Sequence, residues 1–350
     1  MRTFPRMMLV CMFATVLVFA LSVGVGFAAE SAETTSVVLP PEPPFVKTPA
    51  ITSFSSTNNA VTLEWAAKQN YEYIVEMKTT GKYAVVLPYT PDISSATIKN
   101  LKTGVPYTFR IRARLTIDEV TGYSDYSLPQ IVRTGPKIFI YLTFDDGPST
   151  KSTPKILKIL AQHGIKATFF MTGGAAQKNK AVARTVYQRG HTIANHSYSH
   201  NYQKLYASPA AFMNDIARSE RAIQQVIGTK PSKVIRFPGG STMGILQRNP
   251  GTLAGIKARV AKGGYQYFDW NVSLADSRMK APKKNALSNY AIRQIKSNVK
   301  AGKQHMVVLA HDTNSRPWTP QEIPRVIKYC ESQGFYFATL TTKSPACKFR

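Results

Sequence analysis

Short runs of alternating apolar and polar residues dominate the segment 45–135. The clearest runs are separated by clusters of Gly, Pro and Asp and lie at 61–65, 71–76, 96–101 and 107–113. Because neighbouring side chains of a strand point to opposite faces, this alternation predicts strands with one buried face. We expect residues 45–135 to form an all-β sandwich.

The pattern changes after Gly135-Pro136, where apolar runs alternate with amphipathic stretches. Helical periodicity is clearest at 153–163, 208–227 and 319–332, and seven apolar runs are candidate strands: 138–144, 167–171, 191–195, 233–237, 266–272, 306–310 and 335–340. Strands that alternate with helices form parallel sheets. Residues 136–350 are therefore expected to be an α/β barrel, whose functional side chains follow the carboxyl ends of the strands.

The N-terminal segment has a different composition. Two arginines precede an uncharged run at 7–29, which is typical of a signal peptide cut after Ala28 or Ala29. That run is also long enough to cross a bilayer, so an uncleaved membrane anchor is the alternative to a signal peptide at 1–29. Residues 30–44 are proline-rich and predict an extended linker. We expect a secreted or cell-envelope-associated protein.

Composition excludes wholesale disorder, because 43% of the 350 residues are hydrophobic. The formal net charge is +26, and it is unevenly distributed: residues 30–135 carry ten basic and ten acidic residues, whereas 136–350 carry 33 and 9. Such an excess favours binding to anionic polymers, which for an exported protein are those of a cell wall. Nucleic acid is not an expected partner, since no zinc-knuckle, RNP or helix-turn-helix pattern is present.

Two cysteines remain once the signal segment is set aside. Cys330 and Cys347 form an even pair, and in an oxidising compartment they are a candidate disulfide that would fix the C-terminal tail to the last helix. Two free thiols are the alternative, because the sequence does not give the Cα separation that a bridge requires.

Candidate chemistry begins at the end of the first strand after residue 136, where Asp145 and Asp146 stand side by side before Gly-Pro. In an extended strand they would point to opposite sides, so that one could ligate a metal while the other stays free; an acidic turn is the alternative. His196 and His200 follow the third strand, and one helical turn would bring both imidazoles to one ion. Together with Asp146 they form an N2O ligand set with open positions, which is typical of catalytic metal sites.

Two further strand ends carry reactive groups. Arg236 can clamp the free carboxylate, and the Pro238-Gly239 step after it leaves a backbone N–H open to a developing oxyanion. His311 follows the run 306–310 and is a candidate general acid.

These motifs carry a family resemblance. In this order Thr-Phe-Asp-Asp-Gly, His-Ser-x-x-His, Arg-x-Pro-Gly and Leu-x-His resemble the motifs of polysaccharide deacetylases of the NodB-homology type, carbohydrate esterase family 4, over about residues 137–342. The resemblance implies a distorted (β/α)7 barrel and metal-dependent removal of acetyl groups from a polymeric sugar. It implies that Asp145 is the catalytic base, that Asp146, His196 and His200 are the metal ligands, and that His311 is the general acid.

The resemblance also assigns supporting roles. Arg236 would orient Asp145, Leu309 would line a pocket for the acetyl methyl, and Pro238 and Gly239 would border the substrate and its oxyanion. The expected ion is Zn²⁺, with Co²⁺ as an alternative; it would bind the acetyl carbonyl and lower the pKa of a water toward about 7.

One motif departs from the family pattern. The usual Asp-x-x-Asp-Trp is replaced by an early Asp269-Trp270 and by Asp276, which has no Trp after it. We expect Asp276 to be the partner of Arg236, with Asp269 as the alternative. The shift leaves open whether Trp270 borders the sugar groove or belongs to the barrel interior.

The segment 45–135 resembles a fibronectin type III domain. Trp65 closes an early strand, and the run 101–107 is similar to the family's turn into a tyrosine corner. The resemblance implies a spacer between the envelope and the barrel.

The charge of the barrel favours one substrate over others. Peptidoglycan lies among acidic wall polymers, so we expect deacetylation of its N-acetylglucosamine, with N-acetylmuramic acid left open. Chitin oligosaccharides and acetylated xylan are alternative substrates. A wall-binding surface protein with an inactive barrel is the alternative function, which the intact Asp-Asp pair and both histidines disfavour.

Overall fold

The computed structural model describes residues 40–278 and 283–349. The signal peptide or anchor predicted at 1–29, and most of the linker predicted at 30–44, lie outside these ranges. Within them, no helix is both long and apolar enough to cross a membrane.

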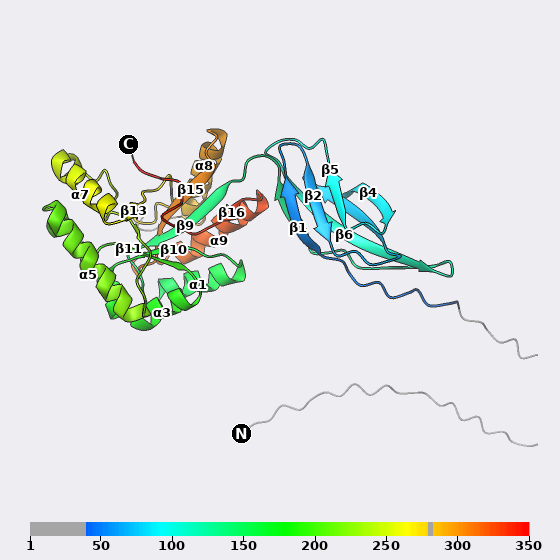
Figure 1. The fold of residues 1–350 in the computed structure, drawn as a ribbon, viewed down its shortest axis with the longest axis horizontal. Coiled ribbons are helices and arrows are strands. Elements are labelled where there is room, and N and C mark those ends of the chain that lie inside the picture. The colour runs from blue at the N-terminus through cyan, green and yellow to red at the C-terminus, as the bar shows by residue number, and fades with distance from the viewer. Residues whose placement is uncertain (1–39, 279–282, 350) are drawn as a thin grey trace, which may run out of the picture. The chain divides into compact units, whose positions relative to one another are not determined.

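The segment before residue 136 contains strands in two antiparallel sheets. One sheet has the order β1-β2-β5; the other has the order β4-β3-β6-β7, with β8 paired to β6 (Figure 1). The strands are β1 Ile51–Ser56, β2 Val61–Trp65, β3 Glu72–Lys78, β4 Ala84–Pro91, β5 Ser95–Ile98, β6 Pro106–Ile117, β7 Val120–Tyr123 and β8 Gln130–Arg133.

The four predicted strands of this segment are present as β2, β3, β5 and β6. In β6, the side chains of Tyr107, Phe109 and Ile111 are buried and alternate with half-buried residues, and they pack with Trp65 and Tyr73 into one core. The sequence did not predict β1, β4, β7 and β8. No side chain of β1 or β4 is buried, so their alternation is weak.

The rest of the chain forms a parallel sheet of eight strands with the order β13-β12-β11-β10-β9-β15-β14, and β16 also pairs with β9. These strands are β9 Phe139–Asp145, β10 Thr168–Met171, β11 Thr192–Asn195, β12 Val234–Ile235, β13 Gln266–Tyr267, β14 Val272–Ser273, β15 His305–His311 and β16 Tyr336–Phe337.

The run 266–272, expected as one strand, forms two strands at opposite ends of this sheet. The Phe268 N–H still donates to Ile235 beside β13, whereas the Asn271 N–H already donates to Val307 of β15. The chain therefore passes from one sheet edge to the other within residues 268–271, which curls the sheet into a barrel. The expected parallel barrel is confirmed, with one more strand than the seven predicted.

Helices surround the strands of the barrel (Figure 1). They are α1 Ser152–Gln162, α2 Gly173–Lys178, α3 Lys180–Gln188, α4 Tyr202–Leu205, α5 Pro209–Ile227, α6 Gly244–Gln247, α7 Pro250–Lys262, α8 Ala286–Lys300 and α9 Thr319–Ser332. The three predicted helices are α1, α5 and α9. The limits of α5 have local causes: the Ser208 hydroxyl accepts from the Ala211 N–H, Pro209 occupies the first turn, and Gly228 ends the helix at φ 82°.

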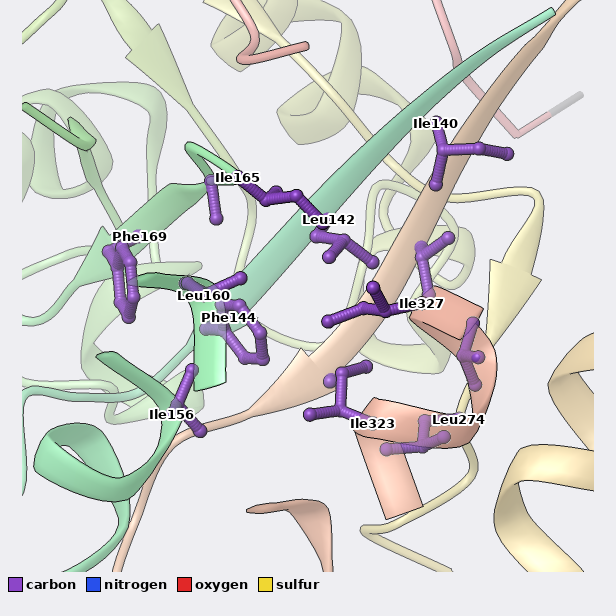
Figure 2. Close-up of a cluster of buried hydrophobic side chains, with 14 of the residues drawn as sticks. Ile140, Leu142, Phe144, Ile156, Leu160, Ile165, Phe169, Leu274, Ile323 and Ile327 are labelled. Carbon is purple, nitrogen blue, oxygen red and sulfur yellow. The ribbon is translucent and has the colours of Figure 1, made fainter. Parts of the chain in front are cut away.

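Strand β9 explains where the site lies. Its side chains Ile140, Leu142 and Phe144 pack outward against α1 and α9, in the cluster that Figure 2 shows. Tyr141, on the opposite face of the strand, packs in a second cluster that also contains Phe170 and Val307. Since both faces are buried, the strand reads as one apolar run, and it ends at Asp145 on the carboxyl edge of the sheet.

The candidate disulfide between Cys330 and Cys347 is absent, and the alternative of two free thiols is what the structure has. Cys330 is buried in the cluster between the sheet and its helices, whereas Cys347 packs against the second cluster. The two side chains therefore belong to different sides of the sheet, and the tail is held instead by the hydrogen bond from the Asp269 N–H to the Cys347 carbonyl.

Candidate active site

A cavity of about 500 Å³ opens at the carboxyl ends of the barrel strands. Its walls include seven of the residues predicted from the sequence: Asp145, Asp146, His196, His200, Gly239, Leu309 and His311. Trp270 has both of the positions that the sequence left open: it lines the cavity and also packs against the buried cluster that contains Phe170 and Val307.

Asp145 is held from behind by a buried arginine. The Arg236 guanidinium is fully buried, and its Nη1 donates to Asp145 Oδ1 at 2.8 Å and to Thr143 Oγ1 at 2.7 Å. Its Nε and Nη2 donate to the backbone carbonyls of Phe268 and Asp269, each at 3.0 Å. A buried charge with a paired carboxylate and filled hydrogen bonds is stable in place, so this arginine can hold Asp145 in one orientation.

The predicted pairing of Asp276 with Arg236 is wrong. The arginine's carboxylate partner is Asp145, and Asp269 reaches it only through its backbone carbonyl. The Asp269 carboxylate instead accepts from the Ser241 N–H and hydroxyl, at 2.8 and 2.6 Å. Asp276 follows β14, which pairs with β15, and it therefore lies beside His311 at the end of that strand.

Asp146 and the two histidines converge on one point. Asp146 Oδ1 lies 3.3 Å from His196 Nε2 and 3.2 Å from His200 Nε2. Asp145 Oδ2 lies 3.8 Å from the same His196 nitrogen. The two carboxylates thus do not point to opposite sides as expected, because Asp146 has left strand β9 in a left-handed conformation with φ 72°.

The histidine loop is not the helical turn that the four-residue spacing suggested. Ser197 and His200 have φ values of 70° and 52°, which no right-handed helix contains. Local hydrogen bonds hold the loop: Asn195 Oδ1 accepts from the Ser197 N–H and Ser197 Oγ accepts from the His200 N–H, both at 3.0 Å. His196 Nδ1 lies 2.9 Å from the Arg236 carbonyl, so Nδ1 carries the proton and Nε2 faces Asp146 as a free ligand atom.

These three side chains fit a divalent cation. Their ligand atoms lie within 4.8 Å of one another, and Asp146 Oδ1 is buried with no hydrogen-bond partner. Burial by itself would raise the pKa of Asp146, but the two imidazoles outweigh it and lower the pKa far below its usual range. A buried, ionised oxygen between two imidazole nitrogens is a donor set suited to Zn²⁺ and similar ions.

The contacts of His311 with Asp276 suit the role of a general acid. Its Nδ1 donates to Asp276 Oδ1 and its backbone N–H to Asp276 Oδ2, both at 2.8 Å, which leaves Nε2 free. Burial lowers the pKa of His311, but the Asp276 carboxylate outweighs it and raises the pKa to about 9. The imidazole is therefore protonated at neutral pH.

Of the remaining predicted residues, two line the cavity and one does not. Gly239, with φ 76°, and Leu309 both reach the cavity wall, as the sequence suggested. Pro238 is buried, and its carbonyl accepts from the Tyr206 hydroxyl at 2.7 Å.

Sequence reasoning missed part of the cavity wall: Tyr202, Ser273, Ser277, Arg278, Tyr290, Gln294 and Arg316. Tyr202 begins α4 (Tyr202–Leu205), Ser273 lies in β14, Tyr290 and Gln294 lie in α8, and the other three lie in loops. Apart from Ser277, no motif marks them. Ser277 could have been found, because it stands where the family motif has Trp.

Comparisons with known proteins agree with this geometry. A family model described as polysaccharide deacetylase matches residues 132–253. The chain is 33% identical over 197 residues to a peptidoglycan-N-acetylglucosamine deacetylase of Bacillus cereus, covering 56% of this chain and 67% of that protein. It is 30% identical over 227 residues to a second such Bacillus cereus enzyme, covering 64% and 93%. The catalytic domain of a peptidoglycan N-acetylglucosamine deacetylase from Eubacterium rectale matches with a TM-score of 0.55 and 33% identity, over 63% of this chain and 96% of that domain.

Site and relatives together define a hydrolase that acts on the amide bonds of acetylated sugars. The chain belongs to the polysaccharide deacetylase family. The predicted family and its barrel-type fold are thereby confirmed for the C-terminal part of the chain.

Proposed function

We propose that this protein is a metal-dependent deacetylase of peptidoglycan N-acetylglucosamine. The observation that carries the metal dependence is the buried, unpartnered oxygen of Asp146 between His196 and His200. The proposed substrate is supported by the two Bacillus cereus relatives, which are peptidoglycan-N-acetylglucosamine deacetylases, and by the positive charge of the barrel.

In the proposed mechanism the chain's own residues move two protons. A divalent cation, Zn²⁺ or alternatively Co²⁺, would polarise the acetyl carbonyl and acidify the attacking water. Asp145 Oδ2 lies on the side of the metal ligands while Oδ1 is held by Arg236, so Oδ2 is free to take the proton of that water. His311 Nε2 gives its proton to the departing amine, the Gly239 N–H supports the oxyanion, and Leu309 contacts the acetyl methyl.

Acetate release tests the function. Peptidoglycan, chitin oligosaccharides and acetylated xylan would be compared at equal acetyl concentration. We expect the highest kcat/KM on peptidoglycan. A higher kcat/KM on xylan or chitin would show that this polymer is the substrate instead. If no acetate is released from any of the three, the alternative function of a wall-binding surface protein is favoured.

Removal of the metal is expected to abolish activity. Chelation should stop acetate release, and Zn²⁺ or Co²⁺ should restore it, because the three ligands leave open positions for substrate. His196→Ala should contain much less metal than the natural protein by elemental analysis, since two ligands do not define the site. Undiminished turnover by the stripped protein would exclude this mechanism.

The rate should depend on the protonation of His311. Because only the protonated imidazole can donate, kcat/KM should fall as the pH rises through about 9. Asp276→Asn removes the group that raises this pKa, so its alkaline limb should move to lower pH. Glu322→Gln, which removes a carboxylate bonded to the Ser288 hydroxyl, is the matched control. An unshifted limb in the Asp276 variant would contradict the assignment.

We further propose that residues 45–135 are a fibronectin type III-like spacer and that the protein is exported to the cell envelope. A tyrosine-corner contact supports the first proposal: the Lys102 N–H donates to the Tyr107 hydroxyl at 2.8 Å. The second proposal is supported by the two arginines at the start of the chain, the uncharged run at 7–29 and the proline-rich stretch at 30–44. Fractionation and N-terminal sequencing of the exported protein would distinguish a cleaved signal peptide from an anchor.

Anionic wall polymers are the proposed second partner. The barrel has 33 basic and 9 acidic residues, so its binding to these polymers should weaken steeply with salt, because exposed charges are screened over about 10 Å at 0.1 M. Turnover of a short neutral oligosaccharide should change far less over the same range. Wall binding that does not respond to salt would overturn the electrostatic proposal.

A further inference from the structure

Two arginine side chains that have no role in the proposed mechanism line the active-site cavity. Arg278 and Arg316 line the same cavity as Asp145, Asp146 and His311. Arg278 is exposed and Arg316 is half-buried, so both guanidinium groups are accessible to a ligand.

The backbone that carries both arginines is tied to His311. Arg278 lies two residues after Asp276, and Arg316 lies three residues before Thr319. The Asp276 carboxylate accepts from the His311 N–H at 2.8 Å and from the Thr319 hydroxyl at 2.6 Å. One buried carboxylate thus holds both loops beside the group that is proposed to protonate the leaving amine.

Neither arginine is neutralised by the protein. Among the described residues, the carboxylates that line the cavity are Asp145, which is paired with Arg236, and Asp146, which lies between two histidines. No ion pair joins Arg278 or Arg316 to any carboxylate in the described ranges, and residues 279–282 contain no acid. Two guanidinium groups without a carboxylate partner on the wall of one cavity are suited to bind an anion, and the planar fork of arginine matches a carboxylate.

We propose that Arg278 and Arg316 bind a carboxylate carried by the glycan substrate, beside the acetamido group that is hydrolysed. The proposal rests on the proposed deacetylase function and narrows its substrate to acidic amino-sugar glycans. In peptidoglycan this carboxylate is either the lactyl group of a neighbouring sugar without a peptide or a carboxylate of the attached peptide. Chitin oligosaccharides carry no such group.

The experiment compares substrates that differ in this group alone. The full-length protein, Arg278→Gln, Arg316→Gln and the double variant would be assayed on peptidoglycan tetrasaccharides with free lactyl carboxylates, on the same tetrasaccharides with carboxylates reduced to alcohols, and on tetrasaccharides with attached peptide. The natural protein should prefer the acidic forms by about 10- to 100-fold in kcat/KM, as charge-assisted contacts predict. The acidic form that shows the larger preference identifies the source of the carboxylate.

The matched control removes the same charge elsewhere. Arg293 and Arg325 line a separate groove between α8 and α9, and the double variant Arg293→Gln/Arg325→Gln should keep the preference. The Arg278/Arg316 double variant should lose most of it. An equal loss in both double variants, or a fall in kcat/KM that is the same on acidic and reduced substrates, would overturn the proposal.

A binding measurement separates this inference from the proposed function. Calorimetry would compare the deacetylated acidic tetrasaccharide with its reduced form, neither of which can be hydrolysed at the acetamido group. A protein that releases no acetate but prefers the acidic ligand through Arg278 and Arg316 would refute the deacetylase and keep the carboxylate site. An active enzyme with no preference in rate or binding would refute the carboxylate site alone, and a protein with neither property would refute both.

Discussion

Asp145→Asn is expected to lower kcat by about 10²- to 10⁴-fold, the usual contribution of a general base, and to leave the bound metal unchanged. The asparagine oxygen can still accept from Arg236, which donates to Asp145 Oδ1 at 2.8 Å, so the local structure should persist. Only the proton acceptor on the side of the metal ligands is lost. Turnover by acetate release and metal content by elemental analysis measure the two effects separately.

Asp146→Asn is the matched control for this variant. It changes the neighbouring carboxylate, whose Oδ1 lies 3.2 Å from His200 and 3.3 Å from His196, and it should reduce metal content together with activity. If both variants lose metal equally, or if Asp146→Asn keeps it, the roles of the two carboxylates have been assigned wrongly.

Arg236→Met is expected to destabilise the protein by about 3–5 kcal/mol, the range for breaking a buried ion pair from one side. The arginine is fully buried, and its removal would leave Asp145 as a buried charge without its partner and two backbone carbonyls without their donor. The free energy of unfolding from denaturant titration is the measurement.

A second variant tests the stated cause of this loss. If the unpaired Asp145 charge is responsible, then Asp145→Asn in the Arg236→Met background should recover part of the stability, because the charge is gone. A double variant that is as unstable as the sum of the two single variants would show that the arginine acts through packing instead.

The secondary structure could be predicted wherever burial imposes a pattern. The run at β9 is apolar because both of its faces are buried, and β6 alternates because one face is. Strands β1 and β4 were not predicted, since none of their side chains is buried. The sequence also did not predict that the run 266–272 divides into two strands at opposite edges of the sheet. That division depends on the closure of the barrel and not on the local pattern of residues.

The reactive residues could be identified because each follows a strand end at motif spacing. The sequence did not show which of these residues pair with one another. Arg236 and Asp145 are 91 residues apart, and Asp276 lies 35 residues before His311, so the strand order decides which carboxylate meets which cation. The left-handed turns at Asp146 and Ser197 likewise depend on the hydrogen bonds and contacts around them.

By itself, the sequence determined the kinds of groups in the site, the strands and helices with strong periodicity, and the family. Those properties follow from side-chain chemistry and from the order of neighbouring residues. Only the tertiary structure decided that Asp145 pairs with Arg236, that Cys330 and Cys347 remain apart, and that Arg278 and Arg316 enter the cavity. The reason is physical: each of these contacts joins segments distant in the chain, which meet because a curled parallel sheet brings the carboxyl ends of its strands together.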